Sequence, residues 1–388
     1  MRKITDEERR RRLGVRHFLS SPAEDVESIA ERLVGLHSSD PATVYLSVWA
    51  RSSNFHVKEL EDALYEARSV VRMLGMRRTM FVVTKDIAPV MDSACTRALA
   101  PIERRRLVGY IESQAVASNG SAWLAKVEAR TLAALADEGE ATANHLSKLV
   151  PELATQLRFG EGKRWEGTVA IGTRLLFLLA AEGRILRARP MGSWRSSQYR
   201  WTSTSTWLDG ELPVLEPEHA RARLAGTWLR SFGPATVIDL KWWSGWTVAQ
   251  TKRALADIGA AKVELESGPG YALEGDLVCE DAGEWVAILP SLDSTIMGWK
   301  EREWFLAGLA PFLFDSNGNA GPTVWWNGRV VGGWGQLPDG RVVHRLLQSV
   351  PKRVQKSVQE KTDELTDWLD GVRIIPRFRS PLNRELAP

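Results

Sequence analysis

The order of predicted elements constrains this chain more than any single motif, because one arrangement of helices and alternating stretches recurs along it. The arrangement is clearest just past the middle. An amphipathic helix is predicted over 218–232, then a short helix that stops at Gly245, then a longer helix that Thr247 caps and Gly259 ends. The stretches AKVELES and YALEGDLVCE follow and predict a hairpin around Gly268-Pro269-Gly270. This is the helix-turn-helix order, whose second helix enters the major groove of DNA.

The same order occurs twice before that segment. Up to about Thr84, three or four helix patterns precede VVRMLGMRRTMFVVT, which predicts two short strands around Gly75. From Trp123, a helix that Gly139 stops is followed by a second over ATANHLSKLV, an apolar third, and the hairpin stretches GRILRARP and SSQYRWTSTS. Three helices and a hairpin are the outline of a winged helix. Three such outlines in one chain indicate a DNA-binding protein more strongly than one does.

The last hundred residues have a β texture. The turns Asn327-Gly328 and Asp339-Gly340 predict hairpins in a small sheet or barrel, followed by a helix over 352–369 and an extended basic tail. The predicted fold class is α+β, with three tandem winged helices and a small C-terminal β unit. The predicted boundaries are 1–84 for winged helix 1, 85–122 for a helical connector, 123–216 for winged helix 2, 217–280 for winged helix 3, and 281–388 for the β unit with its closing helix and tail.

Length and composition exclude some cellular settings. With 388 residues, two to four domains are the natural expectation. No apolar run approaches the roughly 18 residues needed to cross a membrane, and the charged N-terminus MRKITDEERRRR is unlike a signal peptide. Cys95 and Cys279 lie far apart and form no CxxC pair, so neither a disulfide framework nor a zinc site is expected. A reducing cytoplasm fits best.

Basic side chains are clustered although the net charge is only +3. The second hairpin combines arginines with tryptophans and serines, a composition that suits a nucleic-acid surface, although each basic cluster also suits a solvated helix face. Three tryptophans within 242–246 crowd the turn of the third unit, and we expect at least two of them to pack inward. The predicted DNA contacts lie in that hairpin and in the longer helix of the third unit: Arg187, Arg189, Arg195, Thr247, Gln250, Lys252 and Arg253.

A polar cluster, His37-Ser38-Ser39-Asp40-Pro41, lies between two apolar helix patterns. Residues 29–36 and 44–49 both place apolar side chains at helical spacing, so packing on both sides holds the cluster rigidly enough to aim side chains at a ligand. A capping role explains the same residues. Asp40 is a good N-cap, Pro41 is favoured at the first helical position, and His37 in a last helical turn is favourable toward the helix dipole. The residues alone leave both interpretations open.

Several catalytic signatures are absent from the sequence. There is no phosphate loop and no nucleophile elbow, and GPGYALEG lacks the spacing of a dinucleotide-binding fingerprint. The six histidines show no metal-ligand spacing. We therefore expect no cofactor and no metal. An enzyme built on this chain would work with a few polar side chains and water.

The chain resembles a known family in a series of segments that spans nearly its whole length. The segments are GLHSSDPATVYLSVWAR, MRRTMFVV, FGPATVIDLKWWSGWTVAQTKRAL, ILPSLDSTIMGWKER and VWWNGRVVGGW. In this order they resemble the winged-helix DNA-binding proteins that include the AlkZ-like DNA glycosylases. The resemblance implies three tandem winged helices and a C-terminal β-barrel-like unit in a C-shaped surface around duplex DNA. It also implies monofunctional excision of bulky alkylated purines, including crosslinked ones.

The catalytic motif of that family matches the polar cluster. The motif is glutamine, an apolar or small residue, then glutamine or aspartate, at a corner between two helices; the matching positions here are His37, Ser38 and Ser39, so both outer residues differ. The resemblance therefore implies catalytic roles for His37 and Ser39. A neutral His37 can accept a proton from water, Ser39 is a second hydrogen-bonding partner, and Asp40 can supply negative charge if it is not used as a cap.

Two hypotheses follow for the function. The first is a monofunctional glycosylase that hydrolyses the N-glycosidic bond of N7- or N3-alkylated purines in duplex DNA. The second is a non-catalytic winged-helix DNA-binding protein, such as a transcriptional regulator or a damage-binding factor. Duplex DNA is the expected partner in both. No heptad segment supplies a surface for dimerisation, so a monomer is expected.

Overall fold

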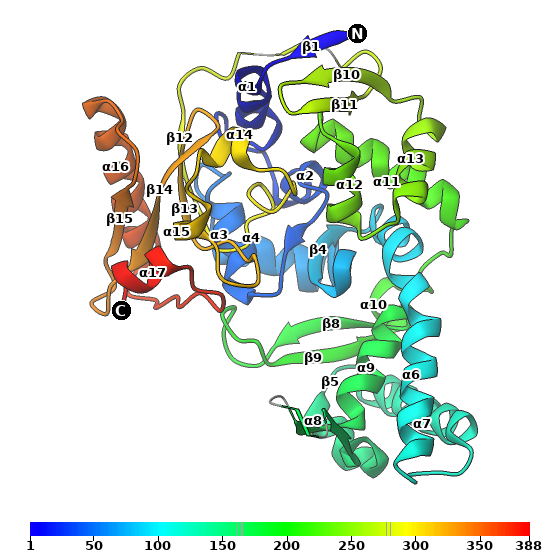
Figure 1. Ribbon diagram of the computed structural model, residues 1–388. Helices are drawn as coiled ribbons and strands as arrows, with labels where there is room; N and C mark the ends of the chain where they lie inside the picture. The colour runs from blue at the N-terminus through cyan, green and yellow to red at the C-terminus, as the bar shows by residue number, and fades with distance from the viewer. Residues whose placement is uncertain (161, 164–165, 277, 280) are drawn as a thin grey trace.

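The computed structural model describes residues 1–160, 162–163, 166–276, 278–279 and 281–388, and Figure 1 shows how its elements are arranged. The fold is mixed α and β. Among these residues no helix combines the length and the apolar character that crossing a bilayer requires.

The first unit contains four α-helices before its hairpin. β3 and β4 form that hairpin, with Val71 opposite Val83, so the predicted pair of strands around Gly75 is confirmed. The elements are β1 (Arg2–Ile4), α1 (Asp6–Arg16), α2 (Val26–Arg32), β2 (Leu36–His37), α3 (Pro41–Trp49), α4 (Val57–Glu61), the π-helical turn η1 (Asp62–Glu66), β3 (Val70–Leu74), the 3-10 turn η2 (Met76–Arg78) and β4 (Met80–Thr84).

The helix before the polar cluster ends earlier than the sequence predicted. α2 stops at Arg32, and His37 lies in β2, opposite Phe81 of β4. Val34 (φ 55°) and Gly35 (φ 114°) both have left-handed backbone, which a continuing α-helix excludes. The prediction that His37 lies in a last helical turn is therefore wrong, and the helix dipole gives no reason for this histidine.

The second unit has the predicted three helices and hairpin, and Gly139 ends its first helix as expected. A short extra hairpin, β6–β7, precedes the third helix. The connector contains α5 (Ala88–Met91), η3 (Asp92–Thr96), η4 (Arg97–Leu99) and α6 (Ala100–Ser113). The unit contains α7 (Gly120–Glu138), β5 (Ala141–Thr142), α8 (Ala143–Leu149), η5 (Pro151–Ala154), β6 (Gln156–Phe159), β7 (Gly167–Ala170), α9 (Ile171–Ala181), β8 (Ile185–Pro190), β9 (Tyr199–Ser203) and α10 (Thr204–Leu208).

The hairpins of the first two units join into one sheet. β8 is antiparallel to β3, with Arg187 opposite Arg72, and the strand order is β2-β4-β3-β8-β9-β5. The β8–β9 hairpin consequently extends toward the C-terminal segment (Figure 1). The hairpin tip contacts that segment, because the Arg195 guanidinium donates to the carbonyl of Arg373 at 2.7 Å.

The third unit has the helix-turn-helix order that the sequence predicted. Its elements are α11 (Pro217–Phe232), α12 (Val237–Ser244), α13 (Val248–Asp257), β10 (Ala261–Leu265) and β11 (Gly268–Ala272). Capping boxes begin α12, between Thr236 and Asp239, and α13, between Thr247 and Gln250. Gly245 ends α12 with a φ of 80°.

The hairpin of the third unit turns earlier than predicted. Gly268-Pro269-Gly270 belongs to β11 rather than to the turn, and β11 ends at Ala272. The predicted second strand over 271–280 is thus wrong in extent, and residues 277 and 280 lie outside the described residues. Gly270 is required inside the strand, because a Cβ there would lie 2.7 Å from the Leu265 side chain.

The C-terminal unit is an antiparallel meander with the strand order β12-β13-β14-β15. This order leaves β12 and β15 as edges, so the described residues form an open sheet rather than a barrel. The predicted turn at Asn327-Gly328 joins β13 and β14, and the tail, predicted to be extended, contains a short helix. The elements are β12 (Val286–Leu289), α14 (Glu303–Leu306), α15 (Ala310–Leu313), β13 (Thr323–Trp326), β14 (Arg329–Gln336), β15 (Val342–Leu346), α16 (Lys352–Leu369) and α17 (Pro381–Leu386).

One large hydrophobic core joins the first, third and C-terminal units, whereas the second unit has its own. Trp243 and Trp246 are buried in the shared core, which confirms that at least two of the three crowded tryptophans pack inward. A fully buried ion pair crosses it: Arg51, just after α3, contacts Asp293, just after β12, at 2.7 Å. The segment that follows Asp293 is thereby held against the polar cluster.

Candidate functional site

The polar cluster at 37–41, here called the corner, is anchored by two elements distant in sequence. The backbone N–H of Ser38 donates to the carbonyl of Met80 in β4 at 2.8 Å. The backbone N–H of His37 donates to Ser294 Oγ at 3.3 Å, and that hydroxyl donates in turn to the carbonyl of Gly35 at 2.8 Å. Ser294 belongs to the segment beside the buried ion pair, so the rigid core of the molecule sets the backbone of the corner.

His37 is a buried, neutral imidazole. The residue is 4% exposed. Its ring packs edge-on against the ring of Phe81, with the two centroids 5.1 Å apart. Burial, and secondarily the charge of Arg77, lowers the pKa of His37 to about 3. Nδ1 accepts a long hydrogen bond from the N–H of Ser39 at 3.4 Å. A neutral ring that accepts at Nδ1 carries its proton on Nε2, which has no hydrogen-bond partner among the described residues.

Asp40 has the capping role that the sequence allowed. It is the N-cap of α3, where Oδ1 accepts from the N–H of Ala42 at 3.3 Å, and Pro41 follows in the first turn. Its other oxygen, Oδ2, accepts from the backbone N–H of Arg377 at 2.8 Å. Burial raises the pKa of Asp40, while the two N–H donors lower it. Both carboxylate oxygens are therefore already used by the backbone.

The two serines of the corner differ in accessibility. Ser38 is buried, and its Oγ has no hydrogen-bond partner within the part of the chain that the structure describes. Ser39 is half-buried, and its carbonyl accepts from the guanidinium of Arg377 at 3.5 Å. The C-terminal tail thus lies against Ser39 and Asp40, an arrangement that no local pattern predicted.

A groove of about 860 Å³ is connected to the corner through Met80, although no corner residue lines it. Met80, whose carbonyl binds the corner, lines it, together with side chains of α8, α9 and the β8–β9 hairpin. Most of its lining is apolar and partly aromatic, and Asn144, Thr173 and Gln198 contribute to it along with two arginines, Arg174 and Arg187. An open groove that combines aromatic side chains with arginines is suited to a nucleic-acid strand.

The three predicted arginines of the second hairpin have different partners. Arg187 lines the groove and stacks over Trp201, 4.7 Å from the ring centroid; burial lowers its pKa to about 10. Arg189 stacks over Tyr65 and pairs with Glu66 at 2.7 Å. Arg195 is engaged with the tail. Only Arg187 therefore both reaches the groove and lacks a carboxylate within 4 Å among the described residues.

The predicted contacts on α13 are mostly occupied by the helix itself. Thr247 and Gln250 bind each other as its capping box, and Arg253 pairs with Asp257 at 2.7 Å. Lys252 is exposed. In Figure 1, α13 lies at the outer edge of the third unit, with α12 between it and the first unit. The structure consequently brings Arg187 near the corner but leaves the α13 residues apart from it.

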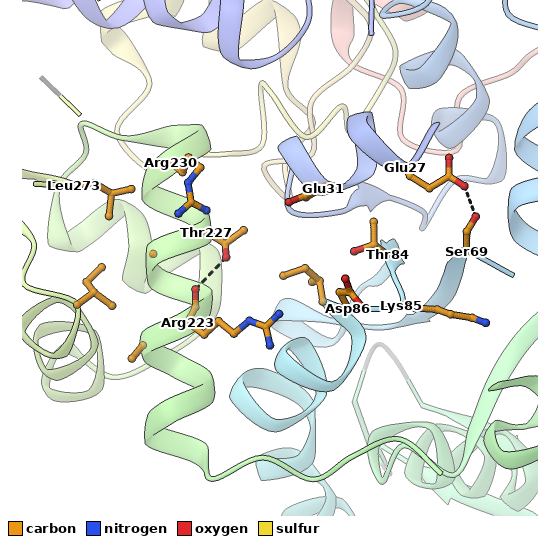
Figure 2. Close-up of a pocket in the computed structure, with 14 residues that line it drawn as sticks. Glu27, Glu31, Ser69, Thr84, Lys85, Asp86, Arg223, Thr227, Arg230 and Leu273 are labelled. Atoms are coloured by element: carbon orange, nitrogen blue, oxygen red, sulfur yellow. Dashed lines mark hydrogen bonds between the residues drawn. The ribbon is translucent and has the colours of Figure 1, made fainter. Parts of the chain in front are cut away.

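Another cavity lies on a different face. It lies between α2 and α11 (Figure 2). Its volume is about 760 Å³. Its lining mixes acids, such as Glu27 and Glu31, with bases, such as Arg223 and Arg230, and none of the corner residues lines it. Glu27 binds the hydroxyl of Ser69 across its edge. This mixture of charges offers no continuous surface for a polyanion.

Sequence reasoning missed residues from other segments that bind the corner or belong to the arginine–tryptophan stack beside it. These are Ser294 and Arg302, which lie in ILPSLDSTIMGWKER, together with Arg77, Trp242 and Arg377. Apart from Arg377, these residues lie in the segments that carry the family resemblance, and this was the one signal for them. Their local patterns indicate a loop or a helix and predict no contact with the corner. Arg377 carried no signal beyond the basic composition of the tail.

Comparisons with known proteins agree with this geometry. The family described as DNA glycosylase AlkZ-like matches residues 30–368, a span that includes the corner. No curated protein matches the chain. Among solved structures, Streptomyces sahachiroi DNA glycosylase AlkZ is similar, with a TM-score of 0.73 and 18% identity, over 94% of this chain and 97% of that one. At this identity, the likeness to AlkZ shows the shared fold.

Proposed function

Because the chain belongs to the AlkZ-like DNA glycosylase family, we propose that it hydrolyses the N-glycosidic bond of alkylated purines, N7- or N3-adducted and including crosslinked ones, in duplex DNA. The observation that carries the proposal is the family match across the corner, where His37 is a buried, neutral imidazole and where Met80, whose carbonyl binds the corner, lines a groove that contains two arginines. The three units of helices and hairpin act as winged helices within the boundaries predicted above, and the protein works as a monomer in the cytoplasm.

The chemistry asks little of the enzyme. A purine alkylated at N7 is already cationic, so it leaves through an oxocarbenium-like state without strong acid assistance. The target nucleotide must first leave the base stack. The protein then has to position a water and stabilise positive charge on the sugar. Neutral hydrogen-bonding groups and one carboxylate are sufficient for these tasks.

His37 is proposed to position rather than to hold a proton. With a pKa of about 3, its ring cannot retain a proton taken from water at neutral pH. Its Nε2–H is free to donate a hydrogen bond to the attacking water or the departing base, as a glutamine amide would. Ser39 holds the tautomer through its N–H, and Asp40 contributes negative charge near the sugar.

The alternative, a non-catalytic DNA-binding protein, is favoured by one observation. Each oxygen of Asp40 accepts a backbone N–H group, so the carboxylate already has the structural role of a helix cap and a tail contact. The same groove and arginines would then serve recognition of DNA without hydrolysis.

Release of free base from duplex DNA that carries 7-alkylguanine separates the two functions. The parent should release base, His37→Ala should not, and both should bind the duplex with similar affinity, because phosphate contacts lie elsewhere. His37→Gln should retain or raise activity, since it restores an amide at this position. If the parent and His37→Gln both bind tightly but release nothing, the glycosylase proposal fails and the binding protein remains.

A further inference from the structure

Two arginines from separate units share one tryptophan ring near the corner. Arg77 lies in η2, the loop of the first hairpin, and its guanidinium carbon is 3.9 Å from the ring centroid of Trp242 in α12. Arg302, which follows the corner-binding segment, places its guanidinium carbon 4.6 Å from the same centroid. Trp242 is half-buried, unlike Trp243 and Trp246. Arg77 is exposed and Arg302 is half-buried, so the two arginines form a cationic cluster that solvent reaches.

Among the described residues, neither guanidinium has a carboxylate oxygen within 4 Å. The Arg302 Nε–H donates to the carbonyl of Trp299 at 2.7 Å, and its Nη2 lies 4.0 Å from Met297 Sδ. The neighbouring Arg78, by contrast, is paired with Glu103. Burial and repulsion from Arg77 lower the pKa of Arg302 to about 10. Two like charges at one ring repel each other until an anion binds.

The one nearby carboxylate that influences Arg302 is already saturated. Asp239 accepts backbone N–H groups from Lys300 and Glu301 at 3.0 and 2.9 Å through Oδ1, and binds Thr236 through Oδ2. It is thus committed to the cap of α12. Among the described residues, no carboxylate is therefore left to pair with the two arginines, which leaves them available to an external anion.

The cluster lies close to the corner, because Arg77 is in the loop of the hairpin whose strand β4 pairs with β2. Arg77 is four residues before Phe81, which pairs with His37 across β2 and β4. A guanidinium stacked on a ring can keep its N–H edge available for bonds to a phosphate. In Arg302, where Nε and Nη2 already have contacts, Nη1 has no hydrogen-bond partner among the described residues. A nucleotide that reaches the corner brings the phosphates on either side of it within the same neighbourhood.

We propose that Arg77 and Arg302, held over Trp242, bind a phosphodiester of the strand that carries the nucleotide to be hydrolysed. This assignment rests on the proposed function, in that it takes duplex DNA as the ligand. By binding the DNA backbone beside the corner, the two arginines would position the sugar of the extruded nucleotide at the corner.

Binding to modified duplexes tests the site without turnover. The probe is a duplex with a tetrahydrofuran abasic analogue, which cannot be hydrolysed, and with one neutral methylphosphonate at each phosphate in turn around it. For the parent, a methylphosphonate at one or two of these phosphates should weaken binding by roughly tenfold, as the loss of a charge-assisted contact does. In Arg77→Gln/Arg302→Gln the same substitutions should have no effect, and the slope of log K against log salt should flatten by about one, since one phosphate contact is lost.

The matched control removes two other arginines. Arg130→Gln/Arg341→Gln loses the same charge from exposed positions paired with Glu152 and Asp339, and it should keep the parent's positional pattern. If the double variant at Arg77 and Arg302 keeps the parent's pattern and slope, the proposal is overturned and the stack only packs two units together. Arg77→Gln alone, at an exposed residue, gives the same test should the double variant not fold.

The two proposals can fail separately. Suppose that a methylphosphonate weakens binding of the parent but not of the double variant, while the parent releases no base. This result supports the phosphate site and overturns only the catalytic function. A parent that does not bind the duplex overturns both.

Discussion

Replacement of His37 by glutamine should make the protein less sensitive to acid. The pKa of His37 is about 3 in the folded protein and about 6.5 in the unfolded chain. A histidine with a lowered folded pKa contributes stability that is complete above pH 6.5 and is lost as pH falls toward 3, because the unfolded state then binds the extra proton. Between pH 8 and pH 5 the parent should therefore lose about 2 kcal/mol of unfolding free energy through this one ring.

His37→Gln removes that loss, because glutamine does not titrate. Any packing defect from the substitution is the same at both pH values, so it cancels in the difference between them. His17, whose pKa burial also lowers to about 3, is present in both proteins and cancels as well. His219→Gln, at an exposed position on α11, is the matched control and should follow the parent.

The assay is urea unfolding at pH 8 and pH 5, followed by tryptophan fluorescence, since His37 adjoins the core that contains most of the buried tryptophans. A ring titration by NMR gives the pKa directly. If His37→Gln loses as much stability as the parent between the two pH values, the imidazole is not buried in a neutral state. The positioning role proposed for it would then have no physical basis.

Four further outcomes follow from the geometry. Base release should vary little between pH 6 and pH 8, because His37 stays neutral, whereas a base of pKa 6.5 would lose about three quarters of its activity at pH 6. Asp40→Asn should cost about 1–3 kcal/mol in thermal unfolding, since one buried N–H loses its acceptor. Trp243→Ala should cost about 3–5 kcal/mol by the same measurement, as the ring is 5% exposed. In DNA binding, Arg187→Gln should flatten the salt slope by about one and Arg189→Gln by much less, because a glutamate already neutralises Arg189.

Local chemistry made much of the fold predictable. Thr247 begins α13, Gly245 ends α12, and Asn327-Gly328 makes a tight turn, and each effect depends on a few adjacent residues. The errors occurred where tertiary contacts decide. Val34 and Gly35 end α2 so that β2 can pair with β4, and Gly270 continues a strand because Leu265 packs where its Cβ would be.

The candidate site was predictable only in part, for the same reason. The corner was found because its polar residues interrupt two apolar patterns. Its partners lie far away in sequence: Ser294 is 257 residues from His37, and Arg377 is 337 residues from Asp40. Periodicity carries no information about such contacts. The helix-turn-helix order predicts DNA contacts on α13. The structure places this helix at the outer edge of the third unit, so its contact with DNA stays a prediction.

The arginines around the corner connect DNA binding to the state of His37. Without DNA, the charge of Arg77 is the second cause, after burial, that keeps the imidazole neutral. A phosphate at Arg77 and Arg302 would balance that charge and remove this cause, so the pKa of His37 should rise when DNA binds. Burial, the larger cause, would remain and would deepen as the strand covers the corner. The ring therefore stays neutral in the complex too, and the same Nε2–H that is free in the unbound protein is the one available to the water or the base during hydrolysis.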